Sequence, residues 1–388
     1  MTFPFPLPSF PRTASAALAL LLWASGVRAQ TTQPTAPDAA GTTARTYAPM
    51  TEGKTSLPAR PNDRPIPAIT HLVIISIDGC RPDLLLRGDT PVMHAMLDRG
   101  TFTFWARTTA ESITLPSHTS MVTGVQPTKH GIQWNADLPL EHPVYPAYPT
   151  LFQLAHKAGY STAMAAGKSK FIALAVPGSI DYLFVPQPGK PAPAIDATTR
   201  PARPEIPDGP VDAAALDKAD GGEPNRNGKV DGVDNNDDVT DAAVAMELQH
   251  QPGILYVHLP STDNMGHKYG WASPRYMAAL HDADTCIGRI LAAVDQVGLT
   301  DHTFVLVTAD HGGAGRGHGP DDPRSRHIPW IATGPGIRRG LDLTTYGDLQ
   351  VDTEDTFATA CYLLGIPIVK KVEGKPITQI VERTELLR

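Results

Sequence analysis

Three short segments of this sequence carry carboxylate and imidazole side chains in patterns typical of metal ligands. Asp78 follows an apolar run and precedes a glycine, so its carboxylate is placed to reach a metal ion, although an Asp-Gly pair is also typical of turns. Asp263 and His267 are four residues apart, which would place both on one face of a helix, and Gly266 leaves room for close approach. These ligand types suit zinc, and also manganese or iron.

The third segment is the densest in potential ligands. Asp310 and His311 follow an apolar run, and His318 follows within a glycine-rich stretch. Neither packing nor a solvated loop requires such a set of residues within nine positions. We therefore predict that this segment binds a metal ion.

A threonine in another segment is a candidate nucleophile. Pro116 fits the first turn of a short helix, and Gly124 fits its end. Thr114 would then lie at the positive end of the helix, which favours a phosphoryl group and an alkoxide. On this segment alone, a simple helix cap is the favoured interpretation of Thr114.

The elements that must position these residues alternate between strands and helices. Three apolar runs typical of buried parallel strands each end just before a potential ligand, at residues 71–78, 254–259 and 304–308. Further strands are predicted at 160–166 and 328–333, and helices at 91–99, 151–158, 274–298 and from 352 or 353 to 364. The pattern predicts an α/β fold, with a mostly parallel central sheet and helices on both faces.

The length of 388 residues allows one large domain, which we predict at 67–388. A polar insert interrupts it at about 186–240, because this stretch is too long for an ordinary loop. Within the insert, Glu223 to Asp234 loosely resembles a calcium loop, but Asp replaces the usual final Glu. One Ca²⁺ site and a solvated acidic loop both remain open.

The N-terminal residues predict export to the periplasm or the medium. Arg12 precedes an apolar run at 14–27, and Ala29 completes a small-residue cleavage site. Residues 1–29 are thus expected to be a signal peptide and 30–66 a flexible linker. An uncleaved anchor is the alternative, but the run is short for a membrane span, so we expect no stable span after cleavage.

Charge and cysteine content exclude other classes. The net charge of -7 gives no indication of a nucleic-acid-binding surface. The cysteines are widely spaced and odd in number, so they predict buried small residues with at most one disulfide: Cys80, Cys286 and Cys361.

The ordered segments resemble the alkaline phosphatase superfamily, and most closely its type I phosphodiesterase and nucleotide pyrophosphatase branch. Thr114 is followed by the Pro-x-His step that ends at His118, as in that branch. Other matching segments are His130-Gly131-Ile132, Asn135, Gly266-His267, Ala309-Asp310-His311-Gly312, Ile328-Pro329 and Gly334-Pro335-Gly336. The resemblance covers residues 71–183 and 241–380.

The resemblance implies two divalent ions, with zinc preferred. The two implied ligand sets are Asp263, His267 and His318 for one ion, and Asp78, Asp310 and His311 for the other. The Thr114 oxygen would lie beside the second ion, and Asn135 would hydrogen-bond a phosphoryl oxygen. His327 is a rival to His318, which we prefer because its Gly-His-Gly setting matches the family. His118 is expected to be structural, or at most to support a residue that touches an ion.

The implied activity is hydrolysis of a small phosphate ester through a phosphothreonine intermediate on Thr114. We expect a phosphodiesterase or nucleotide pyrophosphatase. A phosphomonoesterase and a phosphonate hydrolase are alternatives. A non-catalytic ligand-binding ectodomain is a further alternative, but the presence of every ligand position and of the nucleophile argues against it. A sulfatase is disfavoured, because threonine cannot become the formylglycine that most sulfatases use. A monoester carries an extra negative charge, so a site for it benefits from an added cationic side chain. The candidates are Arg81, Lys168 and Arg316, although Lys168 judged by itself is expected at the surface.

Overall fold

The computed structural model describes residues 64–136, 144–186 and 234–382. The predicted signal peptide, nearly all of the linker, most of the insert and the calcium-like segment up to residue 233 lie outside the described residues. In the part of the chain that is described, no helix has both the length and the apolar character needed to cross a membrane.

One open, mixed sheet forms the centre of the fold, with the strand order β4-β3-β5-β1-β6-β7-β2-β8. The strands are β1 (His71–Ile77), β2 (Thr101–Arg107), β3 (Thr162–Ala166), β4 (Tyr182–Phe184), β5 (Ile254–Leu259), β6 (Thr303–Thr308), β7 (His327–Thr333) and β8 (Leu341–Asp342). All neighbouring pairs are parallel except those of β7, which runs antiparallel to β6 and β2. The predicted mostly parallel sheet is confirmed, with one strand reversed.

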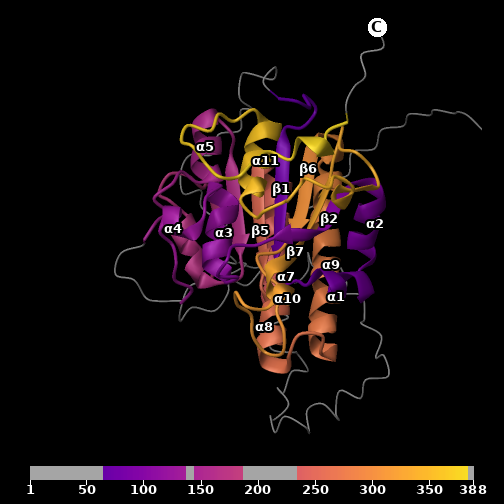
Figure 1. Cartoon of the computed structure of the whole chain (residues 1–388). Coiled ribbons are helices and arrows are strands. Elements are labelled where there is room, and N and C mark those ends of the chain that lie inside the picture. Colours follow the sequence, from indigo (N-terminus) through magenta and orange to yellow (C-terminus); the bar gives the residue numbers. More distant parts are fainter. Residues whose placement is uncertain (1–63, 137–143, 187–233, 383–388) are drawn as a thin grey trace, which may run out of the picture. The chain divides into compact units, whose positions relative to one another are not determined.

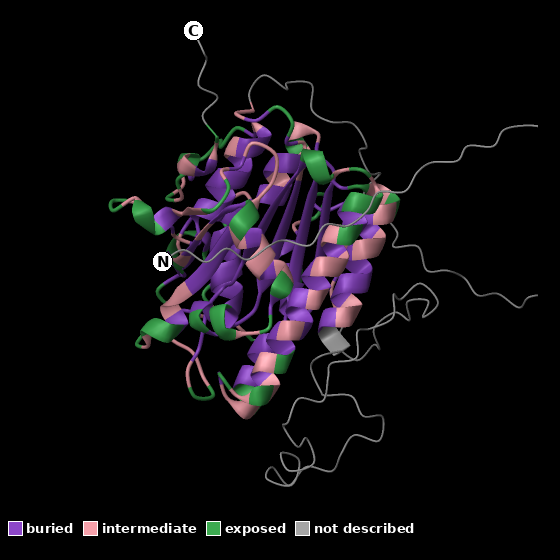
Figure 2. Ribbon diagram, turned by 90° about the vertical axis from the view of Figure 1, so that its right-hand side faces the viewer, coloured by how far each residue is buried: buried purple, intermediate pink, exposed green. Residues whose placement is uncertain are grey.

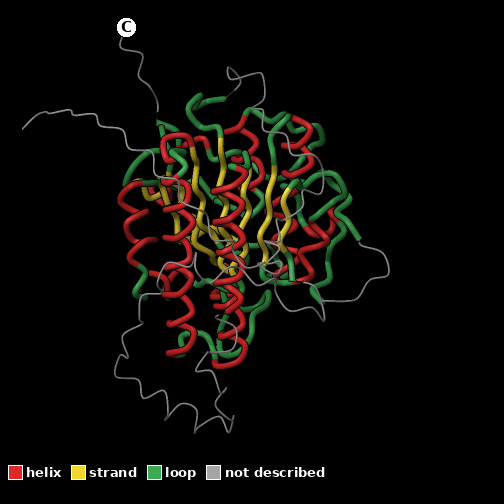
Figure 3. The backbone as a smooth tube through the Cα atoms, turned by 180° about the vertical axis from the view of Figure 1, so that it is seen from behind, coloured by secondary structure: helices red, strands yellow, loops and turns green. Residues whose placement is uncertain are grey.

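Helices cover both faces of this sheet, as predicted. One layer contains α3 (Thr114–Thr123), α5 (Leu151–Ala158) and α11 (Asp355–Leu364), and the other contains α2 (Pro91–Arg99), α7 (Asp234–His250), α8 (Ser261–Tyr269) and α9 (Pro274–Gln296). Figure 1 shows the first layer on the near side, and Figure 3, seen from behind, shows the long helices of the second. Short helices are α1 (Pro82–Arg87), α4 (Pro127–His130), α10 (Pro323–Arg326), η2 (Ser169–Leu174), η4 (Thr300–His302), η5 (Leu343–Thr345) and η6 (Thr378–Ile380).

Burial follows the apolar runs of the sequence. The strands β5 and β6 are buried along their whole length, and β1 is buried from Leu72 onward (Figure 2). The predicted helix ends also hold, since Thr150 and Gln153 form a capping box at the start of α5 and Gly159 ends that helix. All three cysteines are buried, as expected, and none of them forms a disulfide.

Several boundaries differ from the sequence prediction. Helix α7 begins at Asp234, so residues 234–240 of the predicted insert are helical. Acidic residues suit the first turns of a helix, and Asp237 pairs with Arg289 of α9 at 3.1 Å. Helix α11 begins at Asp355 rather than at 352 or 353. The strand β2 and helix α1 were not predicted.

Helix α7 also carries a buried carboxyl whose ionisation should cost stability. Glu247 is 2% exposed, and its Oε2 has no hydrogen-bond partner among the described residues. Burial raises the pKa of Glu247 to about 7. Because the folded state holds this proton to a higher pH than the unfolded state does, stability falls as the pH rises from the ordinary glutamate value to about 7.

We therefore expect Glu247→Gln to be more stable than the wild type above about pH 7, by about 1–3 kcal/mol, and similar to it near pH 4. Urea unfolding at both pH values measures the difference. Asp301→Asn, at an exposed carboxyl, is the control and should change stability by less than about 0.5 kcal/mol. A Glu247→Gln effect of the same size at both pH values would contradict the expectation.

Candidate metal centre

The predicted ligands converge at the carboxyl ends of β1, β5 and β6, three neighbouring parallel strands. Asp78 follows β1, and its backbone N–H donates to the Leu259 carbonyl at 3.0 Å, while the Thr262 hydroxyl donates to the Asp78 carbonyl. These bonds tie the end of β1 to the β5–α8 junction. Asp310 and His311 directly follow β6.

One group of ligand atoms comes from α8 and the loop that follows β6. Asp263, His267 and His318 each offer an atom within 4.8 Å of the others. The Oδ1 atom of Asp263 lies 3.4 Å from His267 Nε2 and 3.8 Å from His318 Nε2. Helical spacing therefore brings Asp263 and His267 together as predicted, and the loop brings His318 to them.

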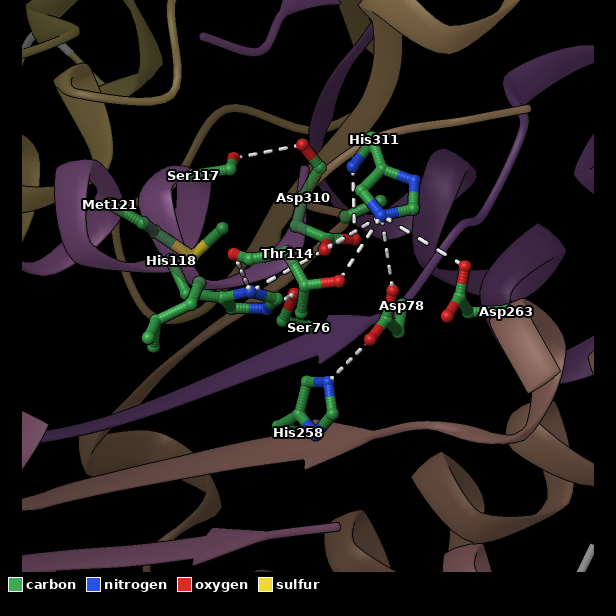
Figure 4. A network of polar contacts seen from close by, with 12 residues as sticks. Ser76, Asp78, Thr114, Ser117, His118, Met121, His258, Asp263, Asp310 and His311 are labelled. Carbon is green, nitrogen blue, oxygen red and sulfur yellow. Dashed lines mark hydrogen bonds and ion pairs between the residues drawn. The ribbon is translucent and has the colours of Figure 1, made fainter. Parts of the chain in front are cut away.

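A second group adjoins the first and shares a residue with it. Asp78, Asp263 and His311 are all buried, and their ligand atoms also lie within 4.8 Å of one another. His311 Nε2 lies 3.4 Å from Asp78 Oδ1 and 3.3 Å from Asp310 Oδ2 (Figure 4). Asp310 thus borders this group, while Asp263 belongs to both. The His311 and His318 rings stack at 3.7 Å between centroids, across the two groups.

The backbone fixes the tautomer of all three histidines. The Nδ1–H of His311, His267 and His318 donates to the carbonyls of Gly312, Arg316 and Ser112, at 2.8, 3.1 and 2.6 Å. Each Nε2 therefore presents a lone pair to the carboxylates. Ser112 has a φ of 50°, a left-handed conformation that is uncommon for serine and typical of strained functional sites.

The carboxylates present lone pairs to the same space. Asp78 Oδ1, Asp263 Oδ1 and Asp310 Oδ2 are buried and have no hydrogen-bond donor among the described residues. Acceptors that face acceptors in a buried site are unfavourable unless a cation lies between them. The carboxylate oxygens and imidazole nitrogens are therefore suitable ligands for divalent metal ions such as zinc.

Burial and charge act against each other on these groups. Burial opposes ionisation of Asp78, but Lys168, His258 and His311 outweigh it and hold its pKa well below the usual range. Burial, with Asp78 and Asp263 nearby, raises the pKa of Asp310 well above its usual range. Burial and His318 lower the pKa of His311 to about 4, so this imidazole is neutral near pH 7 and able to bind a metal.

The candidate nucleophile lies against the second group. Thr114 is the first residue of α3, is 1% exposed, and has its Oγ1 3.4 Å from His311 Nε2. Asn135 lies beside the same helix end, since its Oδ1 accepts from the Leu115 backbone N–H at 2.9 Å and from Lys170 Nζ at 3.0 Å. The amide nitrogen of Asn135 is thus the group able to donate to an anion there.

His318 and His327 are both candidates for the last ligand position, and the structure separates them. His327 packs its ring against Trp105, at 4.5 Å between centroids, and lines a cavity of about 610 Å³ whose lining contains none of the predicted ligands. Only His318 of the two lies with Asp263. His118 is fully buried in α3, and its Nδ1–H donates to the Thr114 carbonyl at 2.8 Å. His118 therefore makes a structural contact at the start of the helix that carries the candidate nucleophile.

One residue corrects the sequence interpretation. Lys168 is not a surface lysine: its side chain is 14% exposed, and its Nζ lies 2.6 Å from Asp78 Oδ2 and 2.7 Å from Asp263 Oδ2. Of the other two candidate cations, Arg81 pairs with Asp83, and the Arg316 side chain is exposed.

Sequence reasoning missed His258 and Trp271. His258 was a polar residue inside an otherwise apolar run, which is a usable signal because buried polar groups need partners. Trp271 Nε1 donates to the Gly79 carbonyl at 2.9 Å, and its ring lies against His267. No local pattern around Trp271 indicated this.

Two glycines leave room for Trp271 beside His267. A Cβ at Gly266 would lie 2.7 Å from the indole ring, and one at Gly313 would lie 2.2 Å from it. Both distances are far below van der Waals contact, so neither position accepts a side chain while Trp271 is present. The close approach predicted for Gly266 is thus made by an aromatic ring.

Comparisons with known proteins identify relatives of this chain. The sequence profile of the type I phosphodiesterase / nucleotide pyrophosphatase family matches residues 72–316. The chain is 30% identical over 165 residues to GPI ethanolamine phosphate transferase 2 of Schizosaccharomyces pombe, covering 39% of this chain and 22% of that protein. It is 27% identical over 116 residues to arylsulfatase K of Danio rerio, covering 29% and 21%. The chain therefore spans about a fifth of the length of these curated relatives.

Solved structures share the fold. Murine ectonucleotide pyrophosphatase / phosphodiesterase 5 in complex with AMP has a TM-score of 0.59 at 13% identity, over 80% of this chain and 100% of that one. The phosphonate monoester hydrolase of Silicibacter pomeroyi has a TM-score of 0.53 at 17% identity, over 81% and 76%. With the family profile matching more than half of its length, the chain belongs to the type I phosphodiesterase / nucleotide pyrophosphatase family of phosphoester hydrolases, within the alkaline phosphatase superfamily.

Proposed function

We propose that this protein hydrolyses phosphodiester or nucleotide pyrophosphate bonds, with Thr114 as the nucleophile and two divalent ions as cofactors. The main support for this proposal is the position of Thr114 Oγ1 at a helix N-terminus, 3.4 Å from His311 Nε2. This position lies beside two adjoining groups of potential metal ligands. The solved relative in complex with AMP supports a nucleotide substrate.

The ligand sets proposed for the two ions are Asp263, His267 and His318, and Asp78, Asp310 and His311, with Asp263 Oδ1 also within reach of the second position. When bound, the ions would lower the pKa of the Thr114 hydroxyl and offset charge on the phosphoryl oxygens. Zinc is our first choice, because carboxylate and imidazole ligands together suit it.

The residues of this chain then have distinct roles. Thr114 Oγ1 attacks phosphorus in line with the leaving oxygen, which departs as the phosphothreonine forms. The amide nitrogen of Asn135 and the Thr114 backbone N–H, at the start of α3, hydrogen-bond the non-bridging oxygens, where negative charge is concentrated. Water hydrolyses the phosphothreonine and restores Thr114.

We also propose that the protein is exported, on the strength of the apolar run at 14–27 and the small-residue cleavage site after it. N-terminal sequencing of protein recovered from the periplasm or medium tests this proposal. A mature N-terminus at or near Gln30 is expected.

The main experiment combines metal analysis with substrate choice. The purified protein is expected to contain about two zinc ions and to turn over bis-p-nitrophenyl phosphate and nucleotide diesters faster than p-nitrophenyl phosphate. If p-nitrophenyl phosphate were preferred, the proposed site would stand, but the substrate would be a phosphomonoester rather than a diester. Absence of bound metal with undiminished activity would overturn the proposed site.

A phosphomonoesterase is the second candidate, and two lysines favour it. Lys168 lies between Asp78 and Asp263, and Lys170 Nζ contacts Asn135. A monoester carries one more negative charge than a diester, so ammonium groups near the phosphoryl position stabilise it more.

We expect Lys170→Met to lower kcat/KM for p-nitrophenyl phosphate by about 10-fold and that for the diester by less than about threefold. The reason is that only the monoester places an extra charged oxygen near this ammonium. Lys157→Met, at an exposed lysine of α5, is the control and should change neither value. Equal losses for both esters would show that Lys170 acts only by holding Asn135.

A further inference from the structure

A histidine that no motif includes lies directly beneath the metal centre. His258 is the one imidazole in β5, is fully buried, and is flanked in register by Ser76 of β1 and Ala166 of β3. Figure 4 shows it below Asp78. A buried imidazole in an apolar strand requires partners for both nitrogens. Both partners are present, and together they determine which nitrogen carries the proton.

The backbone of Gly167 sets the tautomer of His258. The Gly167 N–H, which also donates to the His258 backbone carbonyl at 3.2 Å, lies 3.2 Å from His258 Nδ1, and a backbone N–H can only donate, so Nδ1 is an acceptor. The ring proton must then be on Nε2, which lies 2.9 Å from Asp78 Oδ2 and donates to it. The direction of this hydrogen bond therefore follows from geometry alone.

Neighbouring rings hold the imidazole in this orientation. The Phe171 ring lies 4.2 Å from it, tilted by 36°, and the His118 ring lies 5.0 Å from it at 81°. Phe171 belongs to η2 and His118 to α3, so two separate elements enclose the side chain above its own sheet. The Nε2–H thus has little freedom to point anywhere except at Asp78.

The two oxygens of Asp78 consequently have different environments. Oδ2 is held by His258 and by Lys168, at 2.9 and 2.6 Å. Oδ1 has no hydrogen-bond donor among the described residues and lies 3.4 Å from His311 Nε2. The carboxylate is therefore oriented so that only Oδ1 is available to a cation.

We propose that His258 is a positioning residue that reserves Asp78 Oδ1 for the metal ion shared with His311. This inference rests on the proposed function, because it assumes that Asp78 is a metal ligand. His258 contacts Asp78 and does not contact Asp263, whereas Lys168 contacts both. The effect of His258 should thus be confined to one of the two ions.

Zn²⁺ titration of chelator-treated protein, in competition with a chromophoric chelator, tests the proposal. In His258→Phe, which keeps a ring and removes the donor, one of the two Zn²⁺ affinities should fall by about 10- to 100-fold and the other by less than about threefold. His258→Gln, whose amide can still donate to Asp78, should restore the weakened affinity to within about fivefold of the wild type. Unchanged affinities in His258→Phe, or equal losses at both positions, would overturn the proposal.

A second measurement does not depend on any variant folding. Nitrogen-15 NMR of the wild-type imidazoles should show His258 as the Nε2–H tautomer, and the Nδ1–H tautomer would overturn the proposal. Failure of the proposed function can be distinguished from failure of the His258 proposal. In the former case, the wild-type protein itself would bind fewer than two Zn²⁺ ions tightly.

Discussion

Replacing Thr114 by alanine is expected to lower kcat for the preferred ester by at least about 10³-fold while the metal content stays at its wild-type value. The reason is that Oγ1 is the atom proposed to bond to phosphorus, whereas the buried carboxylate and imidazole ligands do not depend on it. Steady-state kinetics with elemental analysis of the same preparation measures both quantities. Thr114→Ser, which keeps a hydroxyl, should retain much of the activity.

A matched control lies in the same helix. Thr119 is also fully buried in α3, but its Oγ1 donates to the Leu115 carbonyl at 2.7 Å and faces no ligand group. Thr119→Ala should cost about 1 kcal/mol of stability and leave kcat within about threefold of the wild type. Retention of activity in Thr114→Ala would remove threonine from the reaction and favour direct attack by water.

Replacing His318 by alanine should remove about one of the two bound zinc ions and lower kcat/KM by at least about 100-fold. His318 Nε2 lies 3.8 Å from Asp263 Oδ1, and its Nδ1–H donates to the Ser112 carbonyl, so the Nε2 lone pair faces the ligand group. Elemental analysis and kinetics over a range of added Zn²⁺ measure the effect. Excess Zn²⁺ should recover part of the lost activity.

His327→Ala provides the comparison, because this histidine was the sequence rival for the same role. Its ring packs against Trp105 and away from both ligand groups. Metal content and kcat/KM should remain within about threefold of the wild type. The opposite outcome, with His327→Ala losing an ion and His318→Ala keeping both, would require a different arrangement of the loop after β6.

The parts of the fold that the sequence predicted well are those specified locally. Uninterrupted apolar runs identified β1, β5 and β6, and the ligands at their ends followed because parallel strands share one functional edge. Capping residues such as Thr150 and Ser273 gave the starts of α5 and α9. The spacing of Asp263 and His267 gave one ligand pair directly.

The features that were missed depend on contacts between distant segments. The reversal of β7 is a matter of pairing with β6 and β2, which no local pattern encodes. Lys168 was expected at the surface because a long side chain in a polar segment usually is, whereas its reach to Asp78 and Asp263 depends on the place of β3 in the sheet. His258 was overlooked for the same reason, since its partner is 180 residues away in the chain.

The contact of Trp271 with Gly266 and Gly313 has a consequence for how this protein can diverge. Three positions from two segments compete for one space, so a mutation that gives either glycine a side chain is tolerated only after the indole has been lost. Homologues that have a smaller residue in place of Trp271 are free to carry a side chain at the other two positions. The three positions should therefore vary together among relatives, as a unit that joins α8 to the loop after β6.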